Sequence, residues 1–262
     1  MKTIHPTAII DPKANIHESC EIGPFCVIGP NVTLHEGVTL KAHVIIEGRT
    51  TIGANTTVFP FASLGAAPQD LKYRGEPSEL IIGENNMIRE YVTMNPGTES
   101  GGMKTVVGSD SLFMMNTHVA HDCRLGDHLV LANHATLGGH VQVGDHVWFG
   151  GLSAVHQFVR IGSYAVIGGM AGVENDVIPF GRVKGERGRL AGLNLIRMER
   201  MGLDKAQIKV LQRAFNQLFG EEGTLDQRIE AVSEDFGGDP HVAAIITFAR
   251  AKEKFPLCQP KK

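Results

Sequence analysis

Apolar residues recur at every sixth position along most of this chain. One run extends from Ile4 to Leu64 and another from Val107 to Val173, with no polar residue at a repeated position. A helix turns every 3.6 residues, so a period of six would scatter these side chains around its surface. Very short strands joined by tight turns fit the period, because each strand then points one large apolar side chain inward.

Small residues and glycines also hold fixed places in the repeat. A small side chain often stands two residues before the repeated one, as Cys20, Cys123 and Ala135 do. Glycine often follows it, as Gly23 and Gly126 do, and we expect the backbone to turn sharply there because glycine tolerates such turns. Three strands complete a triangular coil of about 18 residues, and the coils stack at the strand spacing of about 4.8 Å.

The pattern is interrupted twice before it ends. The polar stretches near 65–80 and 95–104 carry no repeat, and we expect them to be loop excursions that project from the coil and bind something. The predicted fold is an all-β solenoid plus α. A parallel β-helix of hexapeptide repeats occupies residues 1–185, and a C-terminal α-helical domain occupies residues 186–262.

Helical spacing begins after the repeat. Leu190, Leu193 and Ile196 predict a first helix, and Asp204 is a candidate N-cap for the next one. Thr224 opens a third predicted helix. A last one begins at Asp239-Pro240, because proline is favoured in the first turn. This unit is expected to cover the open end of the solenoid or to pack beside it.

Composition narrows the function classes. The chain has 262 residues, a net charge of −3 and no run of about 18 apolar residues, so nucleic-acid binding and a membrane span are not indicated. The N-terminus does not have the pattern of a signal peptide. The four cysteines form no C-x-x-C pair, which favours reduced thiols and a cytoplasmic location.

The stretch His118-Val-Ala-His-Asp-Cys123 carries the candidate chemistry. His121 lies two residues past the inward-facing Val119, so it is expected on the outer side of the coil, where it could equally be a solvated surface histidine. A neutral imidazole there could act as a base near neutral pH. Adjacent side chains on one strand point apart, so strand geometry alone does not pair His121 with Asp122.

Coil arithmetic places two further residues near this stretch. Gly139 follows His121 by one coil, and His140 follows Asp122 by one coil. Gly139 could let a substrate approach the backbone or could be an ordinary turn glycine. A metal cluster is an alternative for a chain with twelve histidines, but the ligand spacing of the hexapeptide carbonic anhydrases is not found here, and we expect no metal.

Several motifs together are specific. The insert Gln69-Asp70-Leu71-Lys72-Tyr73, the stretch 118–123, Ala154-Val-His-Gln-Phe158, Gly168-Gly169 and Gly192-Leu-Asn194 resemble the bacterial UDP-N-acetylglucosamine O-acyltransferases over the whole chain. The resemblance implies a left-handed winding and a cytoplasmic homotrimer with active sites between neighbouring solenoids. It also implies transfer of an (R)-3-hydroxyacyl chain from acyl carrier protein to the 3-position of UDP-N-acetylglucosamine, the first step of lipid A biosynthesis. No metal and no cofactor are implied beyond the phosphopantetheine that carries the acyl donor.

The resemblance also assigns roles to residues. It implies His121 as general base, Asp122 as its partner and Gly139 as the donor of an N–H to the oxyanion. The implied substrate-binding residues are Asp70, Lys72, His118, His140, His156, Gln157, Asn194 and Arg200. Gly169 stands at the position that measures the acyl chain, and glycine there predicts a donor of about fourteen carbons rather than about ten. Arg187 and Met201 depart from the best-known members, which have a histidine and a second arginine there.

Four alternatives remain at this point. The acceptor could be a related UDP-sugar with an amine at the 3-position. The chain could be the later N-acyltransferase of the pathway, although that enzyme has an extra domain before its solenoid and the repeat here begins at Ile4. A coenzyme A-dependent acetyltransferase would leave the insert that holds Asp70 and Lys72 unexplained. A purely structural solenoid would have no need of His121.

Overall fold

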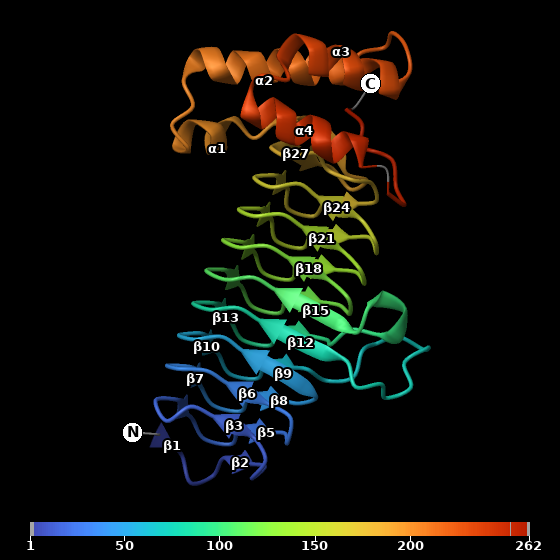
Figure 1. Cartoon of the computed structure of the whole chain (residues 1–262). Helices are drawn as coiled ribbons and strands as arrows, with labels where there is room; N and C mark the ends of the chain where they lie inside the picture. The colour runs from blue at the N-terminus through green and yellow to red at the C-terminus, as the bar shows by residue number, and fades with distance from the viewer. Residues whose placement is uncertain (1–2, 252, 261–262) are drawn as a thin grey trace.

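The chain forms a parallel β-helix with a group of helices at one end (Figure 1). The computed structural model describes residues 3–251 and 253–260. The chain winds through three sheets in turn, which we name A, B and C. The turns between them form three edges, the A–B, B–C and C–A corners.

Each sheet collects every third strand of the chain, as six-residue steps around a triangle require. Sheet A contains β1 (Thr3–Ile4), β4 (Glu21–Ile22), β7 (Thr39–Leu40), β10 (Thr57–Val58), β13 (Met87–Ile88), β16 (Leu112–Phe113), β19 (Val130–Leu131), β22 (Trp148–Phe149), β25 (Val166–Ile167), β27 (Gly181–Lys184) and β28 (Arg189–Leu193). Sheet B contains β2 (Ile9–Ile10), β5 (Val27–Ile28), β8 (Ile45–Ile46), β11 (Ser63–Leu64), β14 (Thr93–Met94), β17 (His118–Val119), β20 (Thr136–Leu137), β23 (Ala154–Val155) and β26 (Gly172–Val173). Sheet C contains β3 (Asn15–Ile16), β6 (Thr33–Leu34), β9 (Arg49–Ile52), β12 (Glu79–Ile82), β15 (Lys104–Val107), β18 (Arg124–Leu125), β21 (Gln142–Val143) and β24 (Arg160–Ile161).

The repeated apolar residues form the core. Each stacks on its equivalent in the next coil, as Ile22 does on Leu40 and Val119 on Leu137. Burial of such a side chain contributes about 1.5–3 kcal/mol, so a ladder of them stabilises a thin interior. Ile4 and Ile10 are exceptions: Ile4 is 40% exposed and Ile10 only partly buried, because no coil lies beneath the first one.

The corners are built from residues in the left-handed backbone conformation, most of which are not glycine. One stack at the A–B corner joins Phe25, His43, Phe61 and Tyr91, with ring centroids 4.9–5.1 Å apart and nearly parallel planes. The left-handed conformation costs roughly 1–2 kcal/mol for such residues. Stacked rings return about 0.5–1.5 kcal/mol a pair, which offsets much of that cost.

The glycines that follow the repeated residues have a different role from the one we expected. Gly23, Gly53 and Gly126 do not have left-handed backbones. A Cβ atom on Gly23 would lie 2.8 Å from the carbonyl carbon of Lys41 in the next coil. These positions need glycine because neighbouring coils approach closely there, and the prediction that glycine makes the sharp turn is wrong for them.

Both loop excursions leave the coil at the B–C corner. The first separates β11 from β12, and the second separates β14 from β15 and contains the short 3-10 helix η1 (Glu99–Gly101). Figure 1 shows them projecting from the same side of the solenoid. They belong to the two coils that precede the turn after β17, so they flank the stretch 118–123 in space.

The helical group contains α1 (Leu195–Arg200), α2 (Lys205–Leu218), α3 (Leu225–Phe236) and α4 (Pro240–Arg250). The predicted starts are confirmed. Asp204 and Thr224 each accept a hydrogen bond from the N3 backbone N–H, while the N3 glutamine bonds back to the cap. Asp239 caps α4, with Pro240 in its first turn.

The helix predicted from Leu190 is wrong over its first part. Residues 189–193 form the strand β28, which pairs antiparallel with β27, and the helix begins only at Leu195. Spacings of three and four residues cannot distinguish a helical face from a strand that buries Leu190 and Leu193 on one side. The boundary that we expected between 185 and 186 falls in the turn between these two strands.

A buried ion pair joins the last coil to the helical group. The Nε and Nη2 atoms of Arg160 lie 2.7 Å from one carboxylate oxygen of Asp176, whose side chain is fully buried. The Arg160 guanidinium also lies over the ring of Phe248 in α4, 4.4 Å from its centre. Across the described ranges 3–251 and 253–260, no helix has the length and apolar character needed to cross a membrane.

Candidate active site

His121 and Asp122 form a hydrogen-bonded pair at the B–C corner between β17 and β18. The His121 Nδ1 atom lies 2.8 Å from Asp122 Oδ2. Asp122 has a φ of 60°, and this left-handed residue turns the chain so that the two side chains meet. The expected divergence of neighbours along a strand therefore does not apply, because the pair stands in a turn.

The second excursion holds the Asp122 carboxylate in place. Thr98 donates its backbone N–H to Oδ1 at 2.9 Å and its hydroxyl to Oδ2 at 2.6 Å. Gly101 packs directly against the carboxylate, where any larger residue would collide with it. The backbone N–H of Asp122 donates to the hydroxyl of Thr105 at 2.8 Å. The acid is thus buried and fixed before any substrate binds. Sequence reasoning missed both threonines, since no repeat relates an excursion to the corner that it covers.

Gly139 lies against the His121 ring from the following coil, as the coil arithmetic predicts. A Cβ atom on Gly139 would stand 2.6 Å from His121 Cε1 and 2.7 Å from Nε2. Within the described part of the chain, the Gly139 N–H has no hydrogen-bond partner, whereas its carbonyl accepts from Phe158. A free N–H beside an imidazole is the arrangement that an oxyanion donor requires.

His140 and His118 flank the pair. The His140 ring meets the His121 ring edge-on at 5.0 Å, and its Nε2 atom lies 3.8 Å from Asp122 Oδ2. Burial is the main cause that lowers the pKa of His140. Burial and the neighbouring His121 likewise lower the pKa of His118, whose Nδ1 atom lies 2.8 Å from Thr93 Oγ1. Both flanking imidazoles are therefore neutral near pH 7.

The ligand atoms of His121, Asp122 and His140 lie within 4.8 Å of one another, close enough to be considered as a metal site. Both carboxylate oxygens already accept hydrogen bonds from Thr98, and one also faces His121. A metal ion there would have to displace the contact between His121 and Asp122. The three side chains are better described as a hydrogen-bonded acid and base with a flanking imidazole.

The first excursion reaches the same corner. Asp70 lies close enough to His140 to raise its pKa, although other causes outweigh this one. The Asp70 carboxylate accepts the backbone N–H of Lys72 at 2.9 Å and so shapes the loop. The Lys72 side chain is exposed and makes no ion pair with any residue that the structure describes. It is therefore available to a ligand.

The remaining predicted residues lie farther along the solenoid. Gln157 is exposed one coil beyond Gly139, and His156 beside it meets the ring of Phe255 at 5.4 Å. Asn194 lies at the C–A corner, where its side chain donates to the Tyr164 carbonyl and caps α1.

Three other positions singled out from the sequence also lie away from His121. Arg200 is exposed at the end of α1. Gly169 lies at the A–B corner, where an added Cβ would be 3.3 Å from the Gly151 carbonyl oxygen. Arg187 pairs with Glu174 at 3.3 Å. A single chain therefore gathers the proposed catalytic residues, but not Asn194, Arg200 or Gly169.

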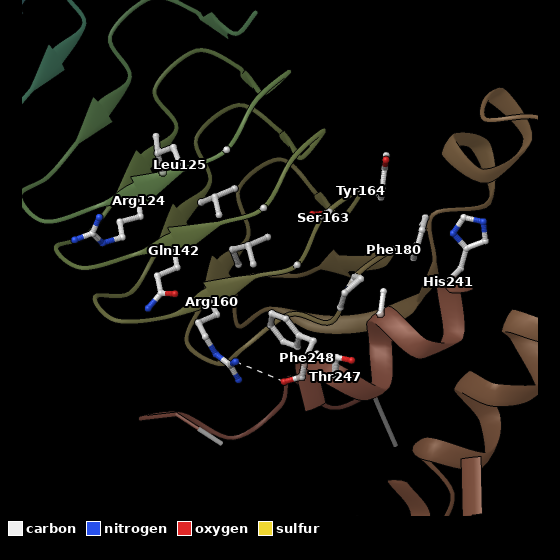
Figure 2. Close-up of a pocket in the computed structure, with 17 residues that line it drawn as sticks. Arg124, Leu125, Gln142, Arg160, Ser163, Tyr164, Phe180, His241, Thr247 and Phe248 are labelled. Atoms are coloured by element: carbon white, nitrogen blue, oxygen red, sulfur yellow. Dashed lines mark hydrogen bonds between the residues drawn. The ribbon is translucent and has the colours of Figure 1, made fainter. Parts of the chain in front are cut away.

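Two hollows lie on the sheet C side of the site. The smaller, of about 270 Å³, is lined by Asp122, His140, Phe158 and Lys254. The larger, of about 770 Å³, lies over the outer face of sheet C against α4, as Figure 2 shows, and contains none of the proposed catalytic residues. The smaller hollow brings a carboxylate and an imidazole together, since Asp122 and His140 both line it and lie 3.8 Å apart.

Three protein-family models match parts of this chain. A model described as UDP N-acetylglucosamine O-acyltransferase, domain 2, matches residues 176–257. A bacterial transferase hexapeptide model of six repeats matches residues 104–139, and a GMPPB C-terminal domain model matches residues 4–60.

Relatives extend over most of the chain. An acyl-[acyl-carrier-protein]–UDP-N-acetylglucosamine O-acyltransferase of Paracoccus denitrificans is 53% identical over 191 residues, which cover 73% of this chain and 72% of the relative. The corresponding enzyme of Rhizobium etli is 43% identical over 78% of this chain and 75% of its own length.

Solved structures match the whole fold. A crystal structure of a UDP-N-acetylglucosamine acyltransferase has a TM-score of 0.95 and 45% identity, and the match covers 99% of this chain and 100% of that one. A structure from Acinetobacter baumannii has a TM-score of 0.94 and 41% identity, with 97% and 99% covered. These matches confirm the left-handed β-helix with C-terminal helices. The chain belongs to the UDP-N-acetylglucosamine O-acyltransferase family.

Proposed function

We propose that this enzyme transfers an (R)-3-hydroxyacyl group from acyl carrier protein to the 3-hydroxyl of UDP-N-acetylglucosamine, the first step of lipid A biosynthesis, with His121 as general base. The observation that carries the catalytic assignment is the fixed contact between His121 and Asp122 beside the free N–H of Gly139. Family membership supports the substrates.

The reaction divides the work among three groups. The sugar hydroxyl oxygen attacks the thioester carbonyl carbon while His121 Nε2 takes the hydroxyl proton. Asp122, bonded to Nδ1, holds the tautomer that leaves Nε2 free and stabilises the imidazolium. The Gly139 N–H binds the oxyanion. When the carbon–sulfur bond breaks, the imidazolium returns its proton to the departing thiolate.

A homotrimer would complete the site. Sheets A and B leave large apolar side chains on their outer faces and on the corner between them, among them Ile45, Phe61, Trp148 and Met170. Faces of this kind mark contacts between proteins. A neighbouring chain packed there would bring its own Asn194, Arg200 and Gly169 toward this His121, which explains why one chain does not gather them.

The state of the cysteines and the nature of the acyl donor both support a cytoplasmic location. All four cysteines are buried and none forms a disulfide, as expected in a reducing compartment such as the cytoplasm. The acyl group arrives on the phosphopantetheine of acyl carrier protein, and the proposed chemistry at His121 requires no further cofactor.

The test is a turnover assay with His121→Ala and a matched control. We expect the variant to lose at least about a thousandfold in kcat/KM, because both proton transfers depend on His121. His35→Ala removes an exposed histidine at the C–A corner, several coils away, and should keep its activity. Retained activity of the first variant would refute the base assignment. Turnover only with the 3-amino sugar would instead refute the hydroxyl acceptor.

A further inference from the structure

The C-terminal segment, residues 253–260, returns from α4 to the catalytic corner. Asp176 anchors it, because its backbone N–H donates to the Pro256 carbonyl and its carbonyl accepts from the Cys258 N–H at 2.7 Å. Phe255 meets His156 edge-on. The segment therefore lies against the end of the solenoid at a defined place, beside the hollow that contains Asp122 and His140.

A stack of rings at the B–C corner leads from this segment to the base. Phe158 lies parallel to His140 with ring centres 4.3 Å apart, and His140 meets His121 edge-on. Above Phe158 the next turn is shorter, since Ile161 pairs with Val177, two residues short of the usual register. Among the residues that the structure describes, no second ring stacks on Phe158.

Lys254 takes the missing place. Its Nζ atom lies 3.3 Å from the centre of the Phe158 ring. His140 covers one face of that ring at stacking distance, so the ammonium covers the other. Within the described residues Lys254 has no ion pair, which leaves the aromatic face as its contact. Ammonium groups bind such faces because the ring carries negative charge there.

We propose that Lys254 is a positioning residue for the acyl transfer, whose charge over the outer face of the Phe158–His140 stack keeps His140 from competing with His121 for Asp122. The inference rests on the proposed function of His121. A protonated His140 would be drawn to the Asp122 carboxylate, from which it now stands 3.8 Å away, and would loosen the contact with His121.

The charges around His140 support this role. Burial is the largest cause that lowers the pKa of His140, whereas the negative charge of Asp122 raises it. His121 and Lys254 lower it further, and Asp70 raises it. The other charged groups facing the hollow are Arg124 on β18 and Glu253 beside Lys254. Without the Lys254 ammonium, less positive charge counteracts the carboxylates of Asp70 and Asp122. His140 should therefore bind a proton at a higher pH.

The experiment compares Lys254→Met with Lys254→Arg in the intact enzyme. Methionine keeps the length and loses the charge, whereas arginine keeps the charge over the ring. We expect the acidic limb of kcat/KM against pH to move to higher pH in Lys254→Met, with a loss of about two- to fivefold on that limb, moderate because salt screens an exposed charge. Activity at pH 8 should be unchanged, and Lys254→Arg should follow the native profile. Lys209→Met, at an exposed position of α2, is the control for loss of a positive charge.

An NMR titration of the His140 ring gives a readout that does not depend on turnover. The His140 titration should move upward in Lys254→Met even if the acceptor or donor differs from the one proposed above. Superposable pH profiles and titrations would overturn the inference. A uniform loss of activity at every pH, without a change in the titration, would also overturn it and would indicate direct substrate binding by Lys254.

Discussion

Replacement of Gly139 by alanine tests the geometry of the site with one methyl group. The added Cβ would stand 2.6 Å from His121 Cε1, whereas ordinary contacts begin at 3.4 Å. Gly139 has an ordinary backbone conformation, so alanine introduces no backbone strain, and its N–H remains in place. The ring must therefore move by about 1 Å while the oxyanion donor stays.

A displacement of that size should be costly to the reaction and harmless to the fold. A shift of about 1 Å costs about a hundredfold in rate, which corresponds to about 2.7 kcal/mol in the barrier. The ring can move outward, because the His121 side chain is 15% exposed, so the melting temperature should change little.

The assay is kcat/KM for the native enzyme, Gly139→Ala and Gly238→Ala, with circular dichroism to verify the solenoid. Gly238 has no neighbour within 4 Å of an added Cβ and serves as the control. A Gly139→Ala enzyme within twofold of native would show that His121 need not stand where the structure has it, and the role of the base would have to be reassigned.

Two further predictions follow from other parts of the chain. Gly169→Met should shift the preferred acyl chain from about fourteen carbons toward about ten, since each buried CH₂ is worth about 0.8 kcal/mol and two change the preference roughly tenfold. Competition between acyl carrier proteins loaded with chains of different length measures this preference. An unchanged preference would show that residue 169 does not measure the acyl chain. Arg160→Met should destabilise the chain by about 3–5 kcal/mol in urea unfolding, because it leaves the Asp176 carboxylate buried without its partner. Addition of Asp176→Leu to Arg160→Met should restore much of the lost free energy of unfolding. A double variant as unstable as Arg160→Met would contradict this account of the buried ion pair.

The solenoid could be predicted because its cause is local and repeated. One apolar residue in six determines which side chains face inward, and Val119 and Leu137 lie where the count puts them. The same count placed Gly139 beside His121, one coil farther along. What the repeat specifies was therefore predictable, including the neighbours of a residue one coil away.

The pairing of His121 with Asp122 was not predictable from strand alternation. It depends on a left-handed backbone at Asp122, and a turn that glycine, asparagine, histidine and aromatic residues all occupy has no single sequence signal. The roles of Thr98 and Lys254 were not predictable for another reason. They reach the corner from an excursion and from the C-terminal segment, and contacts between segments without a shared repeat carry no periodicity.

The stacking of coils has a consequence for how this enzyme can change its dimensions. His121 and the helical group are separated by a whole number of coils, each adding the strand spacing of about 4.8 Å. Removal or duplication of one complete coil keeps every core side chain inside, while loss of a single residue turns a strand inside out. The distance between the base and the end of the solenoid can therefore vary in evolution only in discrete steps, and finer adjustment to a different substrate has to come from the corner side chains.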